Sequence, residues 1–395
     1  MSEAFTKTGR RELLKFAAAG TAGATLASLD RRFAFAQDAA KNRASYKVFS
    51  PGRIGKLKLK NRIVRSATWE SAASNGEVTG AFIGIYRALA EGGVAMIISG
   101  YMGPYNGTES LPSAQINCYD DRFIPGLKKV ADAVRGTDCR LVAQLGHAGA
   151  TIGPSDLTWP KKQQTVKGLS TAQVEEIIGA FANGIRRIKE AGWDGVELHG
   201  AHSYLLCSFL SPFTNQRSDK YGGSTENRVR IIKDIITQAR THVEPDFPIT
   251  IKANCNDGVE GGITLDTWPE QAKALVRAGV TAIDISSNNP MPLAVDAPNK
   301  ESYHLKGALA IADIGVPIIC TGGNRQIDRM EALLQTNGKV DFLGLARPLV
   351  REPGLPKRWL EGKGDATAKC IYCNSCLGAL GKGPVHCVQE TQPAA

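Results

Sequence analysis

"TAQVEEIIGAFANGIRRIKEAG" (residues 171–192) and "GVELHG" (residues 195–200) together predict one helix followed by one buried strand. In the first stretch, apolar residues recur at the spacing of a helix face, and Gly192 follows the last turn, where glycine commonly ends a helix. The second stretch is a short run without regular polar alternation, which suits a parallel strand buried on both faces. The two stretches therefore form one repeating unit of an α/β fold.

Seven further short aliphatic runs share this character. They are "RIVRSA" (62–67), "AMIISG" (95–100), "RLVAQLG" (140–146), "ITIKAN" (249–254), "AIDISS" (282–287), "PIICTGG" (317–323) and "DFLGLAR" (341–347). Eight strands that alternate with helices over roughly 300 residues predict a (β/α)8 TIM barrel as a single domain. A doubly wound open sheet is the alternative fold, because strand runs alone do not show closure.

Polar residues and glycines follow the predicted strands, while the strand interiors are apolar. In barrels of this kind the chemistry lies at the C-terminal ends of the strands. Those ends read Ala67-Thr68-Trp69, Ser99-Gly100-Tyr101, Gln144 with His147, His199 with His202, Lys252 with Asn254, Ser286-Ser287-Asn288, Gly322-Gly323-Asn324 and Ala346-Arg347.

The first 36 residues carry the pattern of an export signal. Arg10 and Arg11 precede a weakly apolar run, and Ala34 and Ala36 supply an A-x-A cleavage signal. We therefore expect a cleavable twin-arginine signal peptide over residues 1–36 and a periplasmic mature protein. A basic amphipathic helix is the alternative. The apolar run is too short and too interrupted to span a bilayer, so no transmembrane segment is expected.

The charge of the chain is modest once this segment is set aside. Residues 1–36 hold six basic and three acidic residues, so the formal net charge falls from +10 to +7 without them. No basic stripe with interleaved aromatic residues occurs, which argues against a nucleic-acid partner. We expect a small-molecule partner, and the sequence leaves open whether the protein is a homo-oligomer. The expected domains are the barrel over residues 37–365 and a cysteine-rich tail over residues 366–395.

The stretch "ELHGAHSY" (197–204) gathers His199, His202 and Tyr204 at one strand end. Two histidines without a nearby carboxylate at ligand spacing give too few ligands for a catalytic zinc ion. A structural role, with both imidazoles bonded to backbone groups, is one alternative. The other is a pair of donors for a carbonyl or phenolate oxygen, with Tyr204 as a general acid.

Two glycines after the seventh predicted strand and an arginine after the eighth indicate an anion site. Gly322 and Gly323 in "CTGGN" would let backbone N–H groups approach phosphate oxygens, and Arg347 in "LGLAR" adds a positive charge. Paired glycines after a strand also mark ordinary turns. Their place in the last two loops of an eight-strand pattern favours phosphate.

Five long motifs now indicate a family. The motifs "VFSPGRIGKLKLKNRIVRSAT", "QLGHAG", "ELHGAHSYLLCSFLSPFTNQRSDKYGGSTENR", "CTGGN" and "GLARPLVREP" together resemble the Old Yellow Enzyme family of FMN-dependent NAD(P)H oxidoreductases, over about residues 47 to 360. The resemblance implies that Ala67, Thr68 and Gly100 line the flavin and that Gln144 bonds its pyrimidine edge. It implies that Gly323, Ala346 and Arg347 hold the flavin phosphate.

The same resemblance also implies which residues contact the electron acceptor. His199 and His202 match the pair that anchors the oxygen of the electron acceptor, and Tyr204 matches the proton donor. Two positions depart from the family pattern. Lys252 stands where many members have an arginine near the flavin, and a point charge there loses the planar fork of arginine. Trp69 stands where many members have threonine or cysteine.

Nine cysteines fall into two groups. Five are scattered in or near apolar runs and are expected to be small core residues: Cys118, Cys139, Cys207, Cys255 and Cys320. The other four lie in "CIYCNSCLGALGKGPVHC" with spacing C-x2-C-x2-C-x10-C, at Cys370, Cys373, Cys376 and Cys387. This stretch resembles the cluster loop of the trimethylamine dehydrogenase and 2,4-dienoyl-CoA reductase branch, which implies a [4Fe–4S] cluster. Zinc-binding, disulfide-forming or relict cysteines are the alternatives.

These patterns predict an enzyme that passes hydride from NAD(P)H through FMN to an α,β-unsaturated carbonyl, quinone or similar electrophilic acceptor. A flavin-free, phosphate-binding barrel lyase or isomerase that uses His199 and Lys252 is one alternative. An exported flavin carrier without turnover is the other.

Overall fold

The computed structural model describes residues 43–106, 112–159, 164–288, 302–335 and 339–390. The predicted signal peptide over residues 1–36 lies outside these described residues. Among the described residues, none of the helices combines the length and apolar character needed to cross a membrane.

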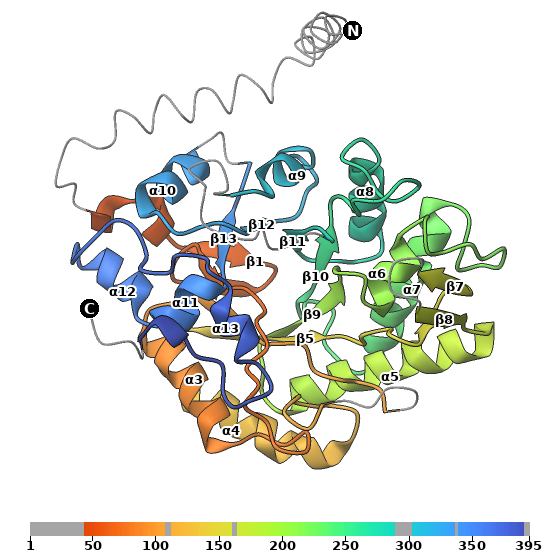
Figure 1. Ribbon diagram of the computed structural model, residues 1–395, viewed down its shortest axis with the longest axis horizontal. Helices are drawn as coiled ribbons and strands as arrows, with labels where there is room; N and C mark the ends of the chain where they lie inside the picture. Colours follow the sequence, from red (N-terminus) through yellow and green to blue (C-terminus); the bar gives the residue numbers. More distant parts are fainter. Residues whose placement is uncertain (1–42, 107–111, 160–163, 289–301, 336–338, 391–395) are drawn as a thin grey trace, which may run out of the picture.

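A closed barrel of eight parallel strands forms the centre of the molecule (Figure 1). In barrel order, the strands are β3 (Ile63–Arg65), β4 (Met96–Ile98), β5 (Arg140–Leu145), β9 (Gly195–Gly200), β10 (Ile249–Asn254), β11 (Ile283–Ser286), β12 (Ile318–Thr321) and β13 (Phe342–Leu345). Each of the eight predicted runs supplies one strand. The prediction of a (β/α)8 barrel is therefore confirmed, and closure rules out the open sheet.

Helices surround the barrel. They are α3 (Gly80–Glu91), α4 (Ile124–Val134), α5 (Thr171–Glu190), α6 (Leu205–Leu210), α7 (Thr225–Ala239), α8 (Trp268–Arg277), α9 (Leu305–Leu309), α10 (Ile327–Gln335), α11 (Arg347–Arg351), α12 (Leu355–Leu360) and α13 (Ser375–Gly378). Short 3-10 turns are η2 (Arg43–Ser45), η3 (Lys47–Phe49), η4 (Asp121–Phe123) and η6 (Val388–Glu390).

Helix α5 shows why these sequences fold as they do. A capping box at its start joins the side chains of Ser170 and Gln173 to each other's backbone N–H groups. Its apolar face, which includes Ile177, Phe181 and Ile185, is buried against the barrel. Gly192 follows the helix with a φ of 82°, a conformation that favours glycine. The helix and its end match the sequence prediction.

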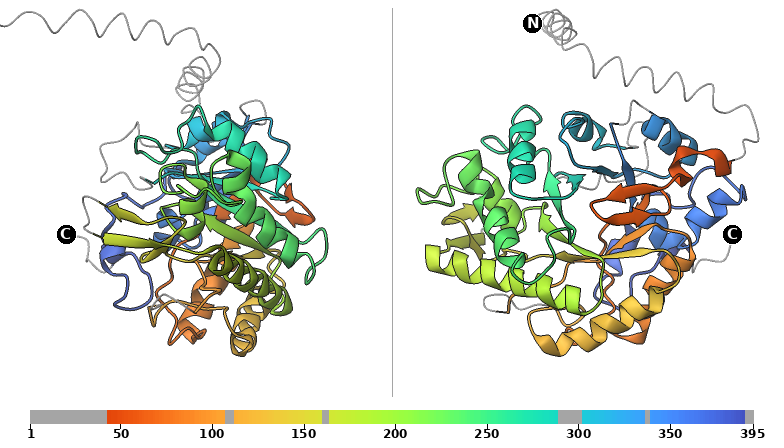
Figure 2. Two further views of the ribbon diagram at one scale, coloured as in Figure 1. Left: turned by 90° about the vertical axis from the view of Figure 1, so that its right-hand side faces the viewer. Right: turned by 180° about the vertical axis from the view of Figure 1, so that it is seen from behind.

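Two additions close the ends of the barrel. A hairpin of β1 (Gly52–Ile54) and β2 (Leu57–Leu59) packs its buried aliphatic residues against residues at the start of the barrel strands. At the other end lies the chain after residue 365, anchored by hydrogen bonds from Ala368 N–H to Arg325 O (2.7 Å) and from Val385 N–H to Glu70 O (2.7 Å). The left-hand view of Figure 2 shows the hairpin and this tail on opposite sides of the barrel.

A small sheet interrupts the barrel pattern between β5 and α5. It contains β6 (Ile152–Gly153), β7 (Leu157–Trp159) and β8 (Gln164–Gly168) in the order β6-β8-β7. In the left-hand view of Figure 2, β7 and β8 project on the same side as the tail. This excursion therefore lies at the end of the barrel that carries the polar strand ends.

Candidate active site

Two adjoining cavities of about 280 and 370 Å³ open at the C-terminal ends of the strands. Six residues line both, so we treat the two as one strand-end cavity: Ala67, Thr68, Trp69, His202, Tyr204 and Lys252. Gly100, Gln144 and His199 line only the first part. Gly322, Gly323, Ala346 and Arg347 line only the second part. The fold thus brings together the predicted catalytic residues and the residues predicted to hold the cofactor.

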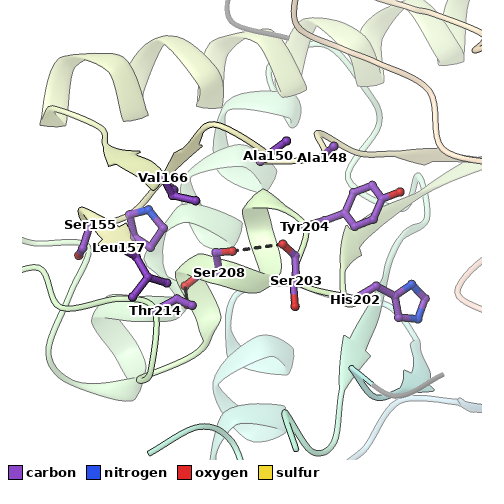
Figure 3. A pocket seen from close by; sticks show the side chains of 13 residues that line it. Ala148, Ala150, Ser155, Leu157, Val166, His202, Ser203, Tyr204, Ser208 and Thr214 are labelled. Atoms are coloured by element: carbon purple, nitrogen blue, oxygen red, sulfur yellow. Dashed lines mark hydrogen bonds between the residues drawn. The ribbon is translucent and has the colours of Figure 1, made fainter. Parts of the chain in front are cut away.

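A strained turn presents the two histidines and the tyrosine. Strand β9 carries His199. In the turn that follows the strand, His202 and Ser203 adopt φ values of 62° and 60°, which L-residues rarely adopt. The ring centroid of His199 lies 5.1 Å from that of His202 and 4.2 Å from that of Tyr204. Figure 3 shows the side chains of His202 and Tyr204 projecting from the same side of this turn.

Both imidazoles are neutral at neutral pH. Burial, followed by the nearby His202 and Lys252, holds the pKa of His199 well below its usual range. Burial and the charge of Lys252 lower the pKa of His202 to about 3. Nε2 of His202 lies 2.6 Å from Ser286 Oγ, and Nδ1 of His199 is buried without a hydrogen-bond partner in the described structure. Neutral rings of this kind can donate one hydrogen bond each.

The floor of the cavity is a buried ionic network that the sequence analysis did not foresee. Lys252 Nζ lies 2.6 Å from Asp284 Oδ2 and 3.2 Å from Ser66 Oγ. Gln144 Nε2 donates to Glu197 Oε1 at 2.8 Å. Burial raises the pKa of Glu197 to about 8, with a smaller contribution from the carboxylate of Asp284. The carboxylates of Asp284 and Glu197, which do not line the cavity, thus hold Lys252 and Gln144 from beneath it.

The register of the barrel explains this network. Parallel pairing aligns Lys252 with His199 on one side and with Asp284 on the other. It also aligns Gln144 with Glu197. The alternating residues of neighbouring strands therefore meet inside the barrel. The only sign of this network in the sequence is one charged residue within each of the apolar runs "GVELHG", "ITIKAN" and "AIDISS".

The far end of the cavity is built to receive an anion. Gly322 and Gly323 adopt φ values of 111° and 76° beside Arg347, whose side chain is only 9% exposed. Arg347 donates to Asn374 Oδ1 and lies 4.4 Å from the ring centroid of Tyr372, both neutral partners. In the described residues, no carboxylate forms an ion pair with this guanidinium. A buried cation without a counter-charge is costly unless a ligand supplies one.

Other polar atoms around the cavity also lack partners. The buried Nε1 of Trp69, Nδ1 of His199 and Oγ1 of Thr321 make no hydrogen bond in the described part of the chain. Buried polar atoms are normally satisfied, so their concentration here indicates a polar ligand.

A second ion pair supports the opposite wall. Arg65 Nη1 lies 3.0 Å from Glu70 Oε1, and both side chains are buried. Glu70 Oε1 also accepts from Gly100 N–H at 2.9 Å, and Arg65 Nη2 donates to Thr68 O at 2.9 Å. A Cβ on Gly100 would lie 2.4 Å from Glu70 Oε2, so this carboxylate requires the glycine. The ion pair thus holds two backbone groups of the cavity wall in place, the N–H of Gly100 and the carbonyl of Thr68.

The tail completes the cavity and carries the predicted cluster cysteines. Its residues Tyr372, Leu377, Leu380 and Val385 line the strand-end cavity. All four tail cysteines line a neighbouring surface hollow that Arg347 and Asn374 also line. They are unpaired thiols, of which Cys370 is buried and Cys373 exposed. The five scattered cysteines are buried and unpaired, which confirms their prediction as core residues.

Single-ion metal sites are absent from the described part of the chain. In the described residues, no three or more Cys, His, Asp or Glu side chains form a group that could hold a metal ion. The four tail thiols therefore line one hollow without converging on one point, and no described residue adds a third ligand to His199 and His202.

Comparisons with known proteins agree with this geometry. The family model described as NADH:flavin oxidoreductase / NADH oxidase matches residues 47–365. A protein named metal reductase from Desulforamulus reducens is 33% identical over 361 residues, which cover 87% of this chain and 53% of that protein. A protein named NADPH dehydrogenase from a Geobacillus species is 33% identical over 324 residues, which cover 78% of this chain and 92% of that protein.

A solved structure extends the likeness. The structure titled as a 2-naphthoyl-CoA reductase complex superposes with a TM-score of 0.79 at 28% identity, over 86% of this chain and 56% of that one. This chain spans about half the length of the first curated relatives that it matches, 53% for each of two. The family match nevertheless covers most of the chain and the barrel residues that line the strand-end cavity. The chain therefore belongs to the NADH:flavin oxidoreductase / NADH oxidase family, the Old Yellow Enzyme family that its sequence motifs predict.

Proposed function

We propose that this protein is an FMN-dependent oxidoreductase that passes hydride from NAD(P)H through FMN to an α,β-unsaturated carbonyl, quinone or similar electrophilic acceptor. The observation that carries the proposal is Arg347, a buried cation that has no counter-charge among the described residues. It lies at one end of a cavity whose other part holds two neutral imidazoles and Tyr204. That pairing suits a phosphorylated cofactor beside an oxygen-binding pocket.

The lining fits FMN residue by residue. Gly322, Gly323, Ala346 and Arg347 would hold the phosphate, since backbone N–H groups and a guanidinium are strong phosphate donors. The amide nitrogen of Gln144 is committed to Glu197, which leaves its carbonyl oxygen to accept from a ring N–H. Lys252 would supply positive charge, and Ala67, Thr68 and Gly100 would pack against the ring.

The side chains then have distinct chemical roles. When bound, FMN would supply two-electron hydride transfer between the nicotinamide and the acceptor. His199 and His202 would hold the acceptor oxygen, and one well-placed donor lowers such a barrier by roughly 3 to 4 kcal/mol. Tyr204 would deliver a proton to the carbon beside the carbonyl group.

Ser286 fixes which nitrogen of His202 can act. A neutral imidazole has one N–H and one acceptor nitrogen. If Ser286 donates to Nε2, then Nδ1 carries the proton and can donate to an acceptor oxygen. We therefore infer that the Ser286 hydroxyl is the donor in this 2.6 Å contact. Ser286 would be a positioning residue for the oxygen-binding pair.

The visible spectrum of the purified protein tests the proposal. We expect the absorption bands of an oxidised flavin, bleaching by NADPH or NADH without oxygen, and recovery of colour when 2-cyclohexenone or a quinone is added. A colourless protein that binds no added FMN would favour the flavin-free alternative. Colour that no reductant bleaches would favour a flavin carrier.

We propose further that Cys370, Cys373, Cys376 and Cys387 hold a [4Fe–4S] cluster. Support comes from their spacing and from the hollow that all four line. A cluster is wider than a single ion, so its ligands need not converge on one point. Anaerobic purification with iron and sulfide analysis tests this, with Cys376→Ser as the variant and core Cys118→Ser as the control. Iron and sulfide absent from the parent protein would leave zinc, disulfide or relict cysteines.

We propose export to the periplasm by the twin-arginine route, on the basis of Arg10, Arg11 and the Ala34-x-Ala36 signal alone. This route carries folded proteins, which suits a cofactor inserted before export. Fractionation of cells with N-terminal sequencing tests the proposal. A protein that stays in the cytoplasm and retains residues 1–36 would refute it.

A further inference from the structure

A second cavity of about 270 Å³ lies directly behind the strained turn that carries the catalytic side chains. We call it the rear hollow. One wall is the small sheet of β6, β7 and β8, and the other is helix α6 with the residues that follow it. Figure 3 shows Ala148 and Ala150 on one side and Ser208 and Thr214 on the other.

The rear hollow touches the strand-end cavity through shared residues. His202 and Tyr204 line both cavities. In Figure 3 their side chains project away from the rear hollow, while Ser203 between them borders it. The turn is therefore a thin partition. The two cavities therefore adjoin at His202 and Tyr204, with this turn between them.

Among the residues that the structure describes, the lining of the rear hollow carries no charged side chain. It consists of small, hydroxyl and aliphatic residues together with the shared pair: Ala148, Gly149, Ala150, Gly153, Pro154, Ser155, Leu157, Val166, His202, Ser203, Tyr204, Ser208 and Thr214. His202 is neutral at neutral pH. A charged group that entered would lose its hydration without gaining a partner, whereas an alkyl or aromatic group would gain by burial.

Two charged side chains beside these walls have partners within the protein: Arg217 forms an ion pair, and Asp156 accepts a backbone hydrogen bond. Arg217 Nη2 lies 2.6 Å from Asp219 Oδ2, and Arg217 Nη1 donates to Pro154 O at 2.8 Å. Asp156 accepts from Gly168 N–H at 2.7 Å. These contacts hold the walls and leave no free cation facing the hollow among the residues described.

The hydroxyls are also largely committed to the walls. Thr214 Oγ1 donates to Ser208 O at 2.6 Å, and Ser208 Oγ donates to Ser203 O at 3.4 Å. Ser155 Oγ accepts from Gln216 N–H at 2.9 Å. The hollow therefore presents mainly the apolar faces of small side chains.

We infer that the rear hollow binds an uncharged, mainly apolar extension of the electron acceptor. The inference rests on the proposed function and narrows its substrate class to elongated neutral enones or quinones. Acceptors whose extension ends in a carboxylate or phosphate are disfavoured. Leu157 and Val166 at the far wall set the length of the extension.

The test measures binding without turnover, so it stays independent of the proposed reaction. Calorimetry on the holoprotein compares cyclohexanone with cyclohexanones that carry a hexyl chain at carbon 2, 3 or 4. In the parent protein, we expect at least one chain-bearing ketone to bind 10-fold more tightly or better, because each buried CH₂ contributes about 0.8 kcal/mol. The same chain ended by a carboxylate should show no gain.

Variants then test whether the chain gains its affinity by binding in the rear hollow. Ala150→Phe fills the hollow and should reduce the gain from the chain to less than 3-fold, with affinity for cyclohexanone itself unchanged. Leu157→Ala opens the far wall and should favour an octyl chain over a hexyl chain. Ala88→Phe is the control, because Ala88 is an exposed alanine on the outer helix α3.

Three outcomes would overturn the inference. They are equal affinity across the ketone series, absence of binding by every member, and a gain from the chain that survives unchanged in Ala150→Phe. Binding of the chain in a protein that reduces no enone would instead reject the proposed function and leave the rear hollow as a binding site.

Discussion

Lys252 Nζ lies 2.6 Å from Asp284 Oδ2 at the centre of the barrel, and both side chains are almost completely buried. The lysine lines the strand-end cavity, whereas the aspartate lies beneath it. Asp284 therefore offsets much of the positive charge that Lys252 presents to a bound ligand. In the proposed enzyme this pair would set how strongly a reduced, anionic flavin is stabilised.

Asp284→Asn should raise the midpoint potential of the bound flavin. Loss of the carboxylate leaves the charge of Lys252 uncompensated, which favours the reduced anion. We expect a shift of tens of millivolts, since about 30 mV corresponds to 1.4 kcal/mol for a two-electron couple. An equilibrium redox titration at pH 6 measures it, below the pKa of Glu197, so that this neighbour stays protonated.

Asp246→Asn is the matched control. Asp246 is an exposed aspartate that pairs with Lys56 on the surface, and its substitution removes the same formal charge. A potential that stays constant in Asp284→Asn, or that shifts equally in both variants, would contradict a specific role for the buried pair.

Arg347→Ala should weaken FMN binding about 10- to 100-fold without unfolding the barrel. A hydrogen bond to a charged group contributes roughly 1.5 to 3 kcal/mol, and the variant removes such a donor from the anion site. Fluorescence titration of the apoprotein with FMN gives the affinity, and circular dichroism checks the fold. Arg277→Ala is the control, because that arginine pairs with Glu226 on the surface.

Asn374→Ala separates the two roles of Arg347. It removes the hydrogen bond from Arg347 to Asn374 of the tail but keeps the cation. We expect it to retain most of the FMN affinity. If Arg347→Ala binds FMN as the parent does, the phosphate must lie elsewhere.

The sequence predicts the barrel strands and the place of the site for physical reasons. A strand buried on both faces must be apolar throughout, so each of the eight runs is recognisable locally. Closure of the barrel then places every strand end at one opening, and the predicted residues meet there. Even Gly192, with its left-handed conformation, marks the end of α5 from the sequence alone.

What the sequence does not predict depends on contacts between distant residues. The Arg65–Glu70 pair binds Gly100 N–H, and Val385 in the tail binds Glu70 O. Neither contact has a periodic signal. The strands β6, β7 and β8 are short, and β7 and β8 contain exposed residues such as Thr158, Thr165 and Lys167, so they lack the continuous apolar runs that identify the barrel. The rear hollow exists only because this sheet packs beside α6.

Glu197→Gln should remove a pH dependence of stability. Burial raises the pKa of Glu197 to about 8 in the folded protein, from 4.5 as its ordinary value. The folded state therefore holds a proton that the unfolded state releases, and stability falls as the pH rises from about 4.5 to 8. The contribution is of the order of a few kcal/mol, since each tenfold difference in proton affinity between the two states corresponds to about 1.4 kcal/mol.

Urea unfolding at pH 5 and pH 8 measures this effect. The parent should lose more stability between the two pH values than Glu197→Gln, which keeps a side-chain oxygen to accept from Gln144. Glu244→Gln on the surface is the control. If Glu197→Gln loses as much stability between pH 5 and pH 8 as the parent does, the pH dependence comes from other groups.

Replacing His199 and His202 together should weaken binding of enones and quinones alike. These side chains are proposed to hold the acceptor oxygen, and both acceptor classes present one. Reduction of the flavin by NAD(P)H needs no such oxygen contact and should continue. Acceptor affinity that is unchanged in the double variant would show that the oxygen binds elsewhere.

Tyr204→Phe should separate proton transfer from hydride transfer. The phenol stands beside His199, with ring centroids 4.2 Å apart, and the variant removes only its O–H. Oxidation of the nicotinamide should keep its rate, because that half-reaction moves a hydride and takes no proton from the tyrosine. Enone reduction should slow by something like 10²- to 10⁴-fold, the usual contribution of a general acid. Quinones should be affected much less, since their oxygens can take protons from water.

Stopped-flow traces of the two half-reactions measure each rate, with Tyr119→Phe on the outside of the barrel as the control. An enone that Tyr204→Phe reduces at the parent rate would have to receive its proton from another residue or from solvent.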